Sequence, residues 1–227
     1  MTAAPRPDRL VVVLGTGTEV GKTWVSCRIL DRLRVIGSSV AAWKPAQSFD
    51  PEAVVAGARS DAELLAAACG SEPDLVCPPH RSYPIPLAPP MASERLGAGE
   101  VRLAELLAEQ PWRPGTDVGL VEGAGGSRSP IAHDADGNDL ARALAPDLVV
   151  LVADAGLGTL HAVRSALEGL DDLPTVVLLN RYDGSDALHQ DNRRWLAERF
   201  SARVVTAAGV AAYLSTPSGS ARPARLT

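Results

Sequence analysis

The chain has 227 residues, of which 46% are hydrophobic and 22% charged, and its formal net charge is −5. These values are typical of one globular domain, or at most two, and exclude a disordered chain or a long coiled coil. The acidic balance offers no basic stripe, so we expect no nucleic-acid partner. The N-terminal residues contain no apolar targeting segment, and apolar runs such as 148–153 are too short to span a membrane, so we expect no membrane partner.

Short apolar runs rich in β-branched residues alternate with segments of helical period. This pattern predicts a mostly parallel sheet with helices on both faces, in a single α/β domain over residues 1–213. The expected strands are 10–15, 39–43, 117–122, 147–153, 175–179 and 203–206. The expected helices are 22–36, 60–69, 100–109, 138–144, 159–169 and 186–199. The Ser-, Pro- and Arg-rich residues 214–227 are expected to form a poorly ordered tail.

Prolines concentrate in one part of the chain. Residues 73–90 hold seven of the 18 prolines. Because proline interrupts helices, we expect no regular helix there, but an extended excursion that walls a site. The helix expected before this stretch opens with a capping box made by Ser60 and Glu63 and stops at Gly70.

Arginine supplies 20 of the 22 basic residues, which leaves only two lysines, Lys22 and Lys44. Arginine can replace lysine where charge alone is needed, but not where a compact ammonium is required, so both lysines are candidates for chemistry. The three cysteines form no C-x-x-C pair, which argues against a disulfide framework and a zinc cluster. A reducing cytoplasm is the expected location. The four histidines show no metal spacing and suit surface or capping roles.

A glycine-rich turn, within VVVLGTGTEVGKTWVS at 11–26, lies directly between the first strand and the first helix. Backbone N–H groups of such a loop, together with the helix N-terminus, bind nucleotide phosphates. Lys22 would reach the β- and γ-phosphates, and Thr23 would offer its hydroxyl to Mg²⁺. Five residues rather than four separate Gly15 from Gly21, so an ordinary turn with an incidental Lys-Thr pair is the alternative.

Two carboxylates are candidates to hold the metal of a bound nucleotide. Glu122 ends a buried strand and is followed by four small residues, at the sheet end where open α/β folds bind ligands. Asp61 lies in the first turn of its helix, where the helix dipole also favours an acid. For Asp61 a metal role and a structural role therefore both remain open.

Six segments together resemble the dethiobiotin synthetase family. They are GTGTEVGKT, WKPAQS, RSDAELL, VEGAGG, the LGT at 157–159, and Asn180 after TVVLL, and they cover about residues 10–200 in order. The resemblance implies a P-loop NTPase-like fold and an ATP- and Mg²⁺-dependent ligase of biotin biosynthesis. Such an enzyme joins 7,8-diaminononanoate and CO₂ into the cyclic urea dethiobiotin. The resemblance also implies a homodimer whose substrates are a small diamine and CO₂ or bicarbonate.

The resemblance assigns roles residue by residue. Lys44 matches the family's active-site lysine, and Lys22 and Thr18 complete the implied catalytic set. The implied substrate contacts are Thr18, Lys44, Ser48 and Asn192, the last from the neighbouring subunit. The implied nucleotide contacts are Glu19, Val20, Gly21, Lys22, Thr23, Trp24, Asp61, Glu122, Gly123, Ala124, Gly125 and Asn180. Of these, Thr23, Asp61 and Glu122 would surround Mg²⁺, and Asn180 would read the adenine.

Three positions depart from the family pattern. Pro89 and Met91 flank the place of a usual Ser-Pro-His step, His161-Ala162 replaces Asn-His, and Arg128 adds a charge near the expected pocket. A diverged relative that performs the same carbamate-phosphate chemistry on another amine or diamine is therefore an alternative. A second alternative is a partner-regulated ATPase switch, although those proteins carry a lysine where this chain has Thr16. A third is a member that binds nucleotide without catalysis.

Overall fold

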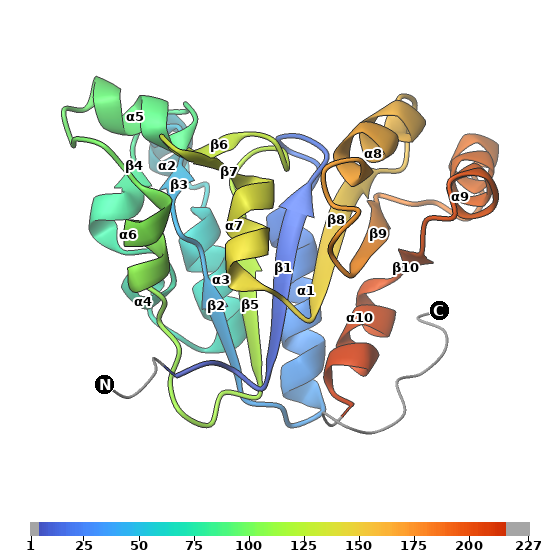
Figure 1. Cartoon of the computed structure of the whole chain (residues 1–227), viewed down its shortest axis with the longest axis horizontal. Helices are drawn as coiled ribbons and strands as arrows, with labels where there is room; N and C mark the ends of the chain where they lie inside the picture. Colours follow the sequence, from blue (N-terminus) through green and yellow to red (C-terminus); the bar gives the residue numbers. More distant parts are fainter. Residues whose placement is uncertain (1–4, 217–227) are drawn as a thin grey trace.

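The computed structural model describes residues 5–216, and its centre is a six-stranded parallel sheet in the order β10-β9-β8-β1-β5-β2 (Figure 1). The strands are β1 (Arg9–Gly15), β2 (Val40–Trp43), β5 (Val118–Glu122), β8 (Leu148–Asp154), β9 (Thr175–Asn180) and β10 (Val204–Val205). All six predicted strands are confirmed. Their continuous apolar runs reflect burial on both faces of a parallel sheet.

Helices cover both faces of this sheet, as predicted. The helices of the first face are α1 (Lys22–Val35), α3 (Asp61–Cys69) and α10 (Ala207–Leu214). The helices of the second face are α6 (Leu103–Ala108), α7 (Gly137–Leu144), α8 (Thr159–Leu167) and α9 (Ala187–Arg199). Alternate residues of β1 point to opposite faces: Val11 and Val13 pack with α1, α3 and α10, whereas Leu10 and Leu14 belong to the core beneath α6 to α9.

The local signals for helix ends are also confirmed, with one correction. Ser60 and Glu63 form the predicted capping box of α3, and Gly70 ends that helix with a φ of 71°. The prediction that 73–90 contains no regular helix is wrong. The segment forms the short helix α4 (Pro73–Val76), a 3₁₀ turn (Pro79–Arg81) and the start of α5 (Pro89–Arg95). Each begins with proline, which is tolerated in the first helical turn because the missing N–H has no helical partner there.

Several short elements had no clear signal in the sequence. They are α2 (Pro51–Val55) and two two-stranded pairs, β3 (Gln47–Ser48) with β4 (Ser82–Tyr83), and β6 (Pro130–Ala132) with β7 (Ala135–Asp136). The helix α10 extends through Leu214, where we expected the tail to begin, and the remainder of that tail beyond 216 lies outside the described residues. Between residues 5 and 216, no helix is both long and apolar enough to cross a membrane.

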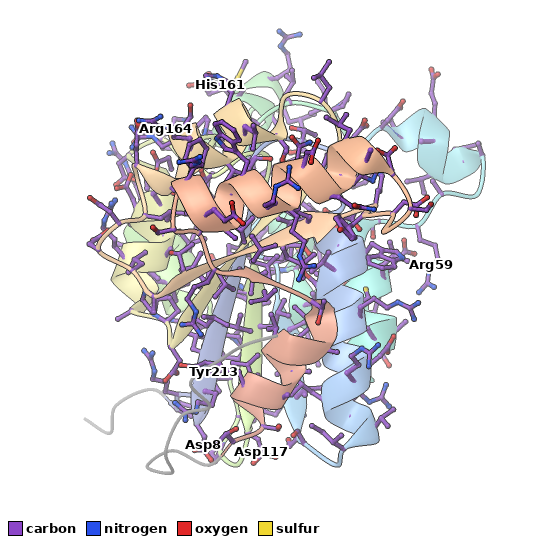
Figure 2. All side chains as sticks on the ribbon, turned by 90° about the vertical axis from the view of Figure 1, so that its right-hand side faces the viewer. Asp8, Arg59, Asp117, His161, Arg164 and Tyr213 are labelled. Atoms are coloured by element: carbon purple, nitrogen blue, oxygen red, sulfur yellow. The ribbon has the colours of Figure 1, made fainter. Side chains whose placement is uncertain are left out.

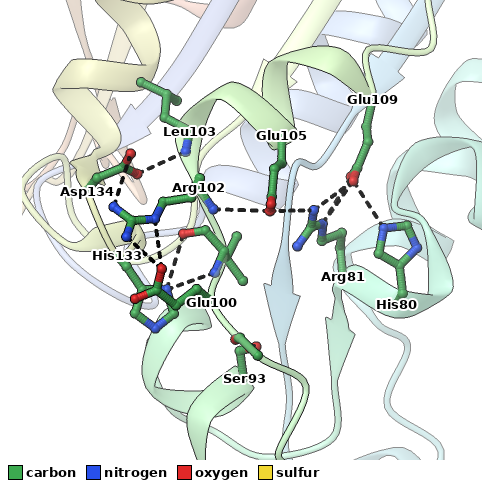
Figure 3. Close-up of polar contacts among 12 residues, drawn as sticks. His80, Arg81, Ser93, Glu100, Arg102, Leu103, Glu105, Glu109, His133 and Asp134 are labelled. Carbon is green, nitrogen blue, oxygen red and sulfur yellow. Dashed lines mark hydrogen bonds and ion pairs between the residues drawn. The ribbon is translucent and has the colours of Figure 1, made fainter.

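An ion-pair network on α6 joins the proline-rich segment to the rest of the domain (Figure 3). Arg81, which is buried, donates to Glu109 at 2.7 Å and to Glu105 at 3.4 Å, and His80 lies 3.1 Å from Glu109. The proline-rich segment is thereby held against α6.

Candidate nucleotide and magnesium site

The glycine-rich loop joins β1 to α1 at the carboxyl end of the sheet, the upper end in Figure 1. Figure 2 shows His161 at this end, and Asp8 and Asp117 at the opposite end. The helix α1 begins at Lys22, directly after Gly21, which has a φ of 89°. Glycine adopts this left-handed conformation without steric cost, and an added Cβ would meet the Asn180 amide. The strand, the glycine-rich loop and the helix therefore follow one another as the sequence predicted.

Lys22 is buried beside this loop, and its ammonium donates to the Gly17 carbonyl at 3.1 Å. Burial and the nearby charge of Lys44 lower the pKa of Lys22 to about 8, although Glu122 and Asp61 act in the opposite direction. A lysine with this weak local pairing is suited to an anion that arrives with a ligand. A nucleotide phosphate would supply that anion.

Lys44 lies in a fully paired cluster next to the loop. Its Nζ is 2.7 Å from Asp61 Oδ2, 2.7 Å from Glu122 Oε1 and 3.1 Å from the Gly123 carbonyl. Burial alone would lower the pKa of Lys44, but the two carboxylates outweigh it and raise that pKa above its usual value. The Lys44 side chain therefore stays cationic in the interior, and its ammonium also lowers the pKa of Asp61 despite burial.

The three predicted metal ligands converge in the same cluster. The Thr23 hydroxyl lies 2.7 Å from Asp61 Oδ1 and 2.9 Å from Glu122 Oε1. Since a Lys44 ammonium already lies between these carboxylates, the donor set accommodates a cation. No group of three or more His, Cys, Asp or Glu side chains suited to a metal occurs among residues 5–216. Two carboxylates and a hydroxyl match Mg²⁺, which takes few protein ligands and completes its shell with phosphates and water.

Two hollows flank the loop. One, of about 630 Å³, is lined by Gly21, Trp24, Asn180, Arg181 and Thr206 among others. The other, of about 610 Å³, is lined by Thr18, Arg128, His161 and Ala162 among others. Two of the three departures from the family pattern thus come together at one cavity beside the loop. The third departure lies at the start of α5, where Pro89 is buried and Met91 is exposed.

The other predicted residues lie at different distances from this centre. Thr18 lies beside Gly125 on the exposed loop. The Asn180 amide donates to the Val20 carbonyl at 2.9 Å, so it contacts the loop and lines the first hollow. Ser48, in β3, has a buried hydroxyl without a partner in the described structure. Asn192 is buried on α9, where its amide donates to the Ala155 carbonyl at 2.9 Å, and its contact with a neighbouring subunit stays a prediction.

Sequence reasoning missed two contributors to the site. The Ser26 hydroxyl is fully buried and donates to Glu122 Oε2 at 2.7 Å. Its spacing of four residues from Lys22, on one helix face, was a usable signal. Arg181 donates to the Glu19 carbonyl at 2.9 Å and pairs with Asp154 at 2.6 Å. No local pattern marks Arg181, because its partners come from two other parts of the chain.

Comparisons with known proteins identify the relatives of this chain. A family model described as an AAA domain matches residues 9–215. The ATP-dependent dethiobiotin synthetase of Caulobacter vibrioides is 42% identical over 162 residues, which are 70% of this chain and 72% of that protein. The enzyme of the same name from Haloferax mediterranei is 34% identical over 200 residues, covering 86% of this chain and 81% of that protein.

Solved structures resemble the chain in fold alone. A putative plasmid partition protein of Borrelia burgdorferi bound to AMPPNP matches with a TM-score of 0.50 and 11% identity, covering 88% of this chain and 87% of that one. The signal recognition particle receptor FtsY of Elizabethkingia anophelis matches with a TM-score of 0.50 and 15% identity, covering 88% of this chain and 58% of that one. The fold is therefore that of the P-loop NTPases, in a single domain. The relatives and the matched domain together show that this chain belongs to the family of ATP-dependent dethiobiotin synthetases.

Proposed function

We propose that the chain catalyses the ATP- and Mg²⁺-dependent closure of 7,8-diaminononanoate and CO₂ into dethiobiotin, in biotin biosynthesis. The observation that carries this proposal is the convergence of Lys44, Glu122, Asp61 and Thr23 beside the phosphate loop. The named relatives are ATP-dependent dethiobiotin synthetases, and they share up to 42% of aligned residues with this chain.

The proposed reaction gathers negative charge at one place. One amine of the substrate adds to CO₂ to give a carbamate. A carbamate oxygen then attacks the γ-phosphorus, and the bond between that phosphorus and the bridging oxygen breaks, so that ADP leaves. The second amine attacks the carbonyl carbon of the resulting anhydride, and phosphate leaves as the ring closes. Positioning and electrostatic stabilisation provide most of the catalysis in phosphoryl transfer.

Each buried cation has a separate role in this reaction. Lys22 would neutralise the γ-phosphate from within the loop, and Lys44 would stabilise the carbamate oxygens. Mg²⁺, held by Thr23, Asp61 and Glu122, would supply positive charge to the β- and γ-phosphates. The unpartnered, buried hydroxyl of Ser48 supports its proposed contact with the diamine, because such a group is normally hydrogen-bonded.

The nucleotide base would occupy the hollow beside Trp24 and Asn180. The Nδ2 atom of Asn180 already donates to Val20, so Oδ1 is the atom available to the base. An acceptor at this position suits the exocyclic amine of adenine. The diamine would then enter from the hollow of Thr18, Arg128 and His161, on the other side of the loop.

The assembly and location of the chain are further parts of the proposal. The resemblance supports a homodimer in the cytoplasm that acts without nucleic acid or membranes. Light scattering after size exclusion tests the dimer, and a monomer at micromolar concentration would contradict it.

The test of the reaction is incubation with ATP, Mg²⁺, [¹³C]bicarbonate and 7,8-diaminononanoate, followed by mass spectrometry. We expect dethiobiotin that carries one ¹³C atom in its ureido group. Absence of this product, together with ADP formation on another diamine, would instead favour the diverged relative. ATP turnover that requires neither amine nor bicarbonate would contradict the ligase assignment altogether.

A further inference from the structure

Two residues in the left-handed backbone conformation meet at the phosphate loop. Four non-glycine residues between 5 and 216 have a positive φ: Glu19, Ala145, Arg181 and Ser201. Two of them, Glu19 at 60° and Arg181 at 55°, are joined directly, since the Arg181 guanidinium donates to the Glu19 carbonyl at 2.9 Å. Non-glycine residues persist in this conformation only where their surroundings hold them, and such residues cluster at functional sites.

The contact continues into a second carboxylate. The other terminal nitrogen of Arg181 donates to Asp154 Oδ2 at 2.6 Å, and Asp154 Oδ1 accepts from the Gly156 N–H at 2.8 Å. Asp154 ends β8 and lies opposite Asn180 in the register of β8 and β9. Arg181 therefore connects the ends of two neighbouring strands to the loop that follows a third.

Arg181 and Asn180 together fix two consecutive carbonyls of the loop. Arg181 holds the Glu19 carbonyl, and Asn180 holds the Val20 carbonyl at 2.9 Å. In a trans peptide the carbonyl and the next N–H point in opposite directions. Holding these carbonyls toward β9 consequently turns the N–H groups of Val20 and Gly21 away from β9. Successive N–H groups set in this way form the concave anion site of a phosphate loop.

We propose that Arg181 is a positioning residue that, with Asp154, holds Glu19 in its left-handed conformation and so keeps the loop ready for phosphate. The proposal rests on the nucleotide binding proposed above. Arg181 acts through the backbone of Glu19, whose side chain is exposed to solvent. Glycine adopts the left-handed conformation without support, so Arg181 should become dispensable when glycine replaces Glu19.

The experiment measures ADP and ATP affinity by calorimetry in wild-type and variant proteins. We expect Arg181→Ala to weaken the binding of both nucleotides roughly tenfold. Without the Arg181 contact, Glu19 should relax out of its left-handed conformation and the loop should lose its shape. Asp154→Asn should cause a smaller loss. Arg142→Ala is the matched control, because Arg142 likewise bridges a carboxylate, Asp172, and a backbone carbonyl, Gly169, away from the site. It should leave nucleotide affinity unchanged.

Variants at position 19 separate positioning from direct contact. Glu19→Gly adopts a φ of 60° without strain, so Glu19→Gly in the Arg181→Ala background should restore most of the lost affinity. Glu19→Ala removes the same carboxylate but keeps the Cβ, and it should restore none. Amide hydrogen exchange of residues 17–21 should rise in Arg181→Ala and fall again with Glu19→Gly.

Two results would overturn the inference while leaving the proposed function standing. One is an unchanged nucleotide affinity in a folded Arg181→Ala protein that melts like the wild type. The other is a loss that Glu19→Gly does not restore, which would indicate that Arg181 contacts the nucleotide itself. Wild-type protein that bound no nucleotide would overturn the proposed function and this inference together.

Discussion

Two ion-pair networks in this molecule differ in what surrounds them. In the first, Lys44 is buried between Asp61 and Glu122, beneath the phosphate loop. In the second, Arg81 pairs with Glu105 and Glu109 at the edge of α6, where both glutamates remain partly exposed (Figure 3). In the first network Lys44 and Glu122 are withdrawn from water and Asp61 reaches the surface, with 38% of its side chain exposed, whereas in the second network Arg81 alone is withdrawn from water.

This difference in burial distinguishes a network suited to the reaction from one that only stabilises the fold. Partly exposed ion pairs contribute about 0–1 kcal/mol each. Removing one glutamate of the second network still leaves Arg81 paired with the other. A buried pair contributes little net stability, but removing one partner is costly because it leaves an uncompensated charge. A buried cation that touches two carboxylates beside a nucleotide loop is therefore better explained by a role in the reaction than by a role in folding.

Replacing Lys44 should give the largest effect. Lys44→Ala should lower kcat by about 100- to 1,000-fold, the usual loss for an electrostatic stabiliser of a reacting oxyanion. ATP affinity, measured by calorimetry, should remain largely intact, since the role proposed for Lys44 is to stabilise the carbamate. Lys44→Arg keeps the charge but not the compact ammonium, so we expect it to fail as well.

The control for both Lys44 variants is the folded state. Loss of the lysine strands the buried Glu122 carboxylate at a cost of about 3–5 kcal/mol. Melting curves with saturating nucleotide show whether each variant is folded during the assay. Wild-type turnover in either folded variant would remove Lys44 from the mechanism.

The next largest effect is expected from Glu122→Gln. This change keeps the side-chain shape but removes the charge that we propose holds Mg²⁺. The Mg²⁺ concentration for half-maximal activity should rise by about 10- to 100-fold, measured by titration at saturating ATP. An unchanged Mg²⁺ requirement would show that Glu122 serves only to pair Lys44.

Ser26→Ala tests the support of Glu122. The Ser26 hydroxyl holds Oε2, which leaves Oε1 facing Thr23 and Lys44. Its removal should weaken Mg²⁺ activation by roughly tenfold, a common loss when the partner of a metal ligand is removed. Thr116→Val is the matched control, since Thr116 is also buried and hydrogen-bonded but lies at the other end of the sheet. An equal loss in both variants would point to stability alone.

The smallest effect is expected from Glu109→Gln, in the network that joins Arg81 to Glu105 and Glu109. Burial raises the pKa of Glu109, but hydrogen bonds from Arg81 and His80 outweigh it and lower that pKa below its usual value. The pairing therefore stabilises the fold above the usual glutamate pKa near 4.3 and is lost as the pH falls through the lower folded value. Denaturant unfolding should give a difference of about 1 kcal/mol between wild type and Glu109→Gln at pH 7.

That difference should shrink as the pH falls below about 4. Turnover at pH 7 should be unchanged in the same variant. A loss of activity as large as that of Ser26→Ala would contradict the division between the two networks.

The central sheet could be predicted from the sequence because buried parallel strands consist of uninterrupted runs of apolar residues. The phosphate loop could be predicted because strand, glycine-rich turn, lysine and helix are contiguous. The short helices that begin at Pro73 and Pro89 could not, since proline usually argues against helix and here occupies the first turn.

The sequence predicts which residues lie near the phosphate loop better than it predicts which of their atoms meet. Glu122 ends one strand and Lys44 follows another, which places them at one sheet end but does not bring them to 2.7 Å. The bridge from Arg181 to Asp154 requires β8 and β9 to be neighbours, and that depends on the strand order of the folded sheet. Such contacts join residues far apart in sequence, so they follow from tertiary packing and not from local pattern.

The most direct test of the proposed chemistry follows one oxygen atom. A single turnover with ATP, Mg²⁺, 7,8-diaminononanoate and ¹⁸O-labelled CO₂ is quenched before the label exchanges with water, and the inorganic phosphate is examined by mass. Because the carbamate oxygen attacks the γ-phosphorus and leaves with it, the phosphate should contain one ¹⁸O atom. Unlabelled phosphate, formed alongside dethiobiotin, would contradict the carbamate-phosphate route and the role given to Lys44.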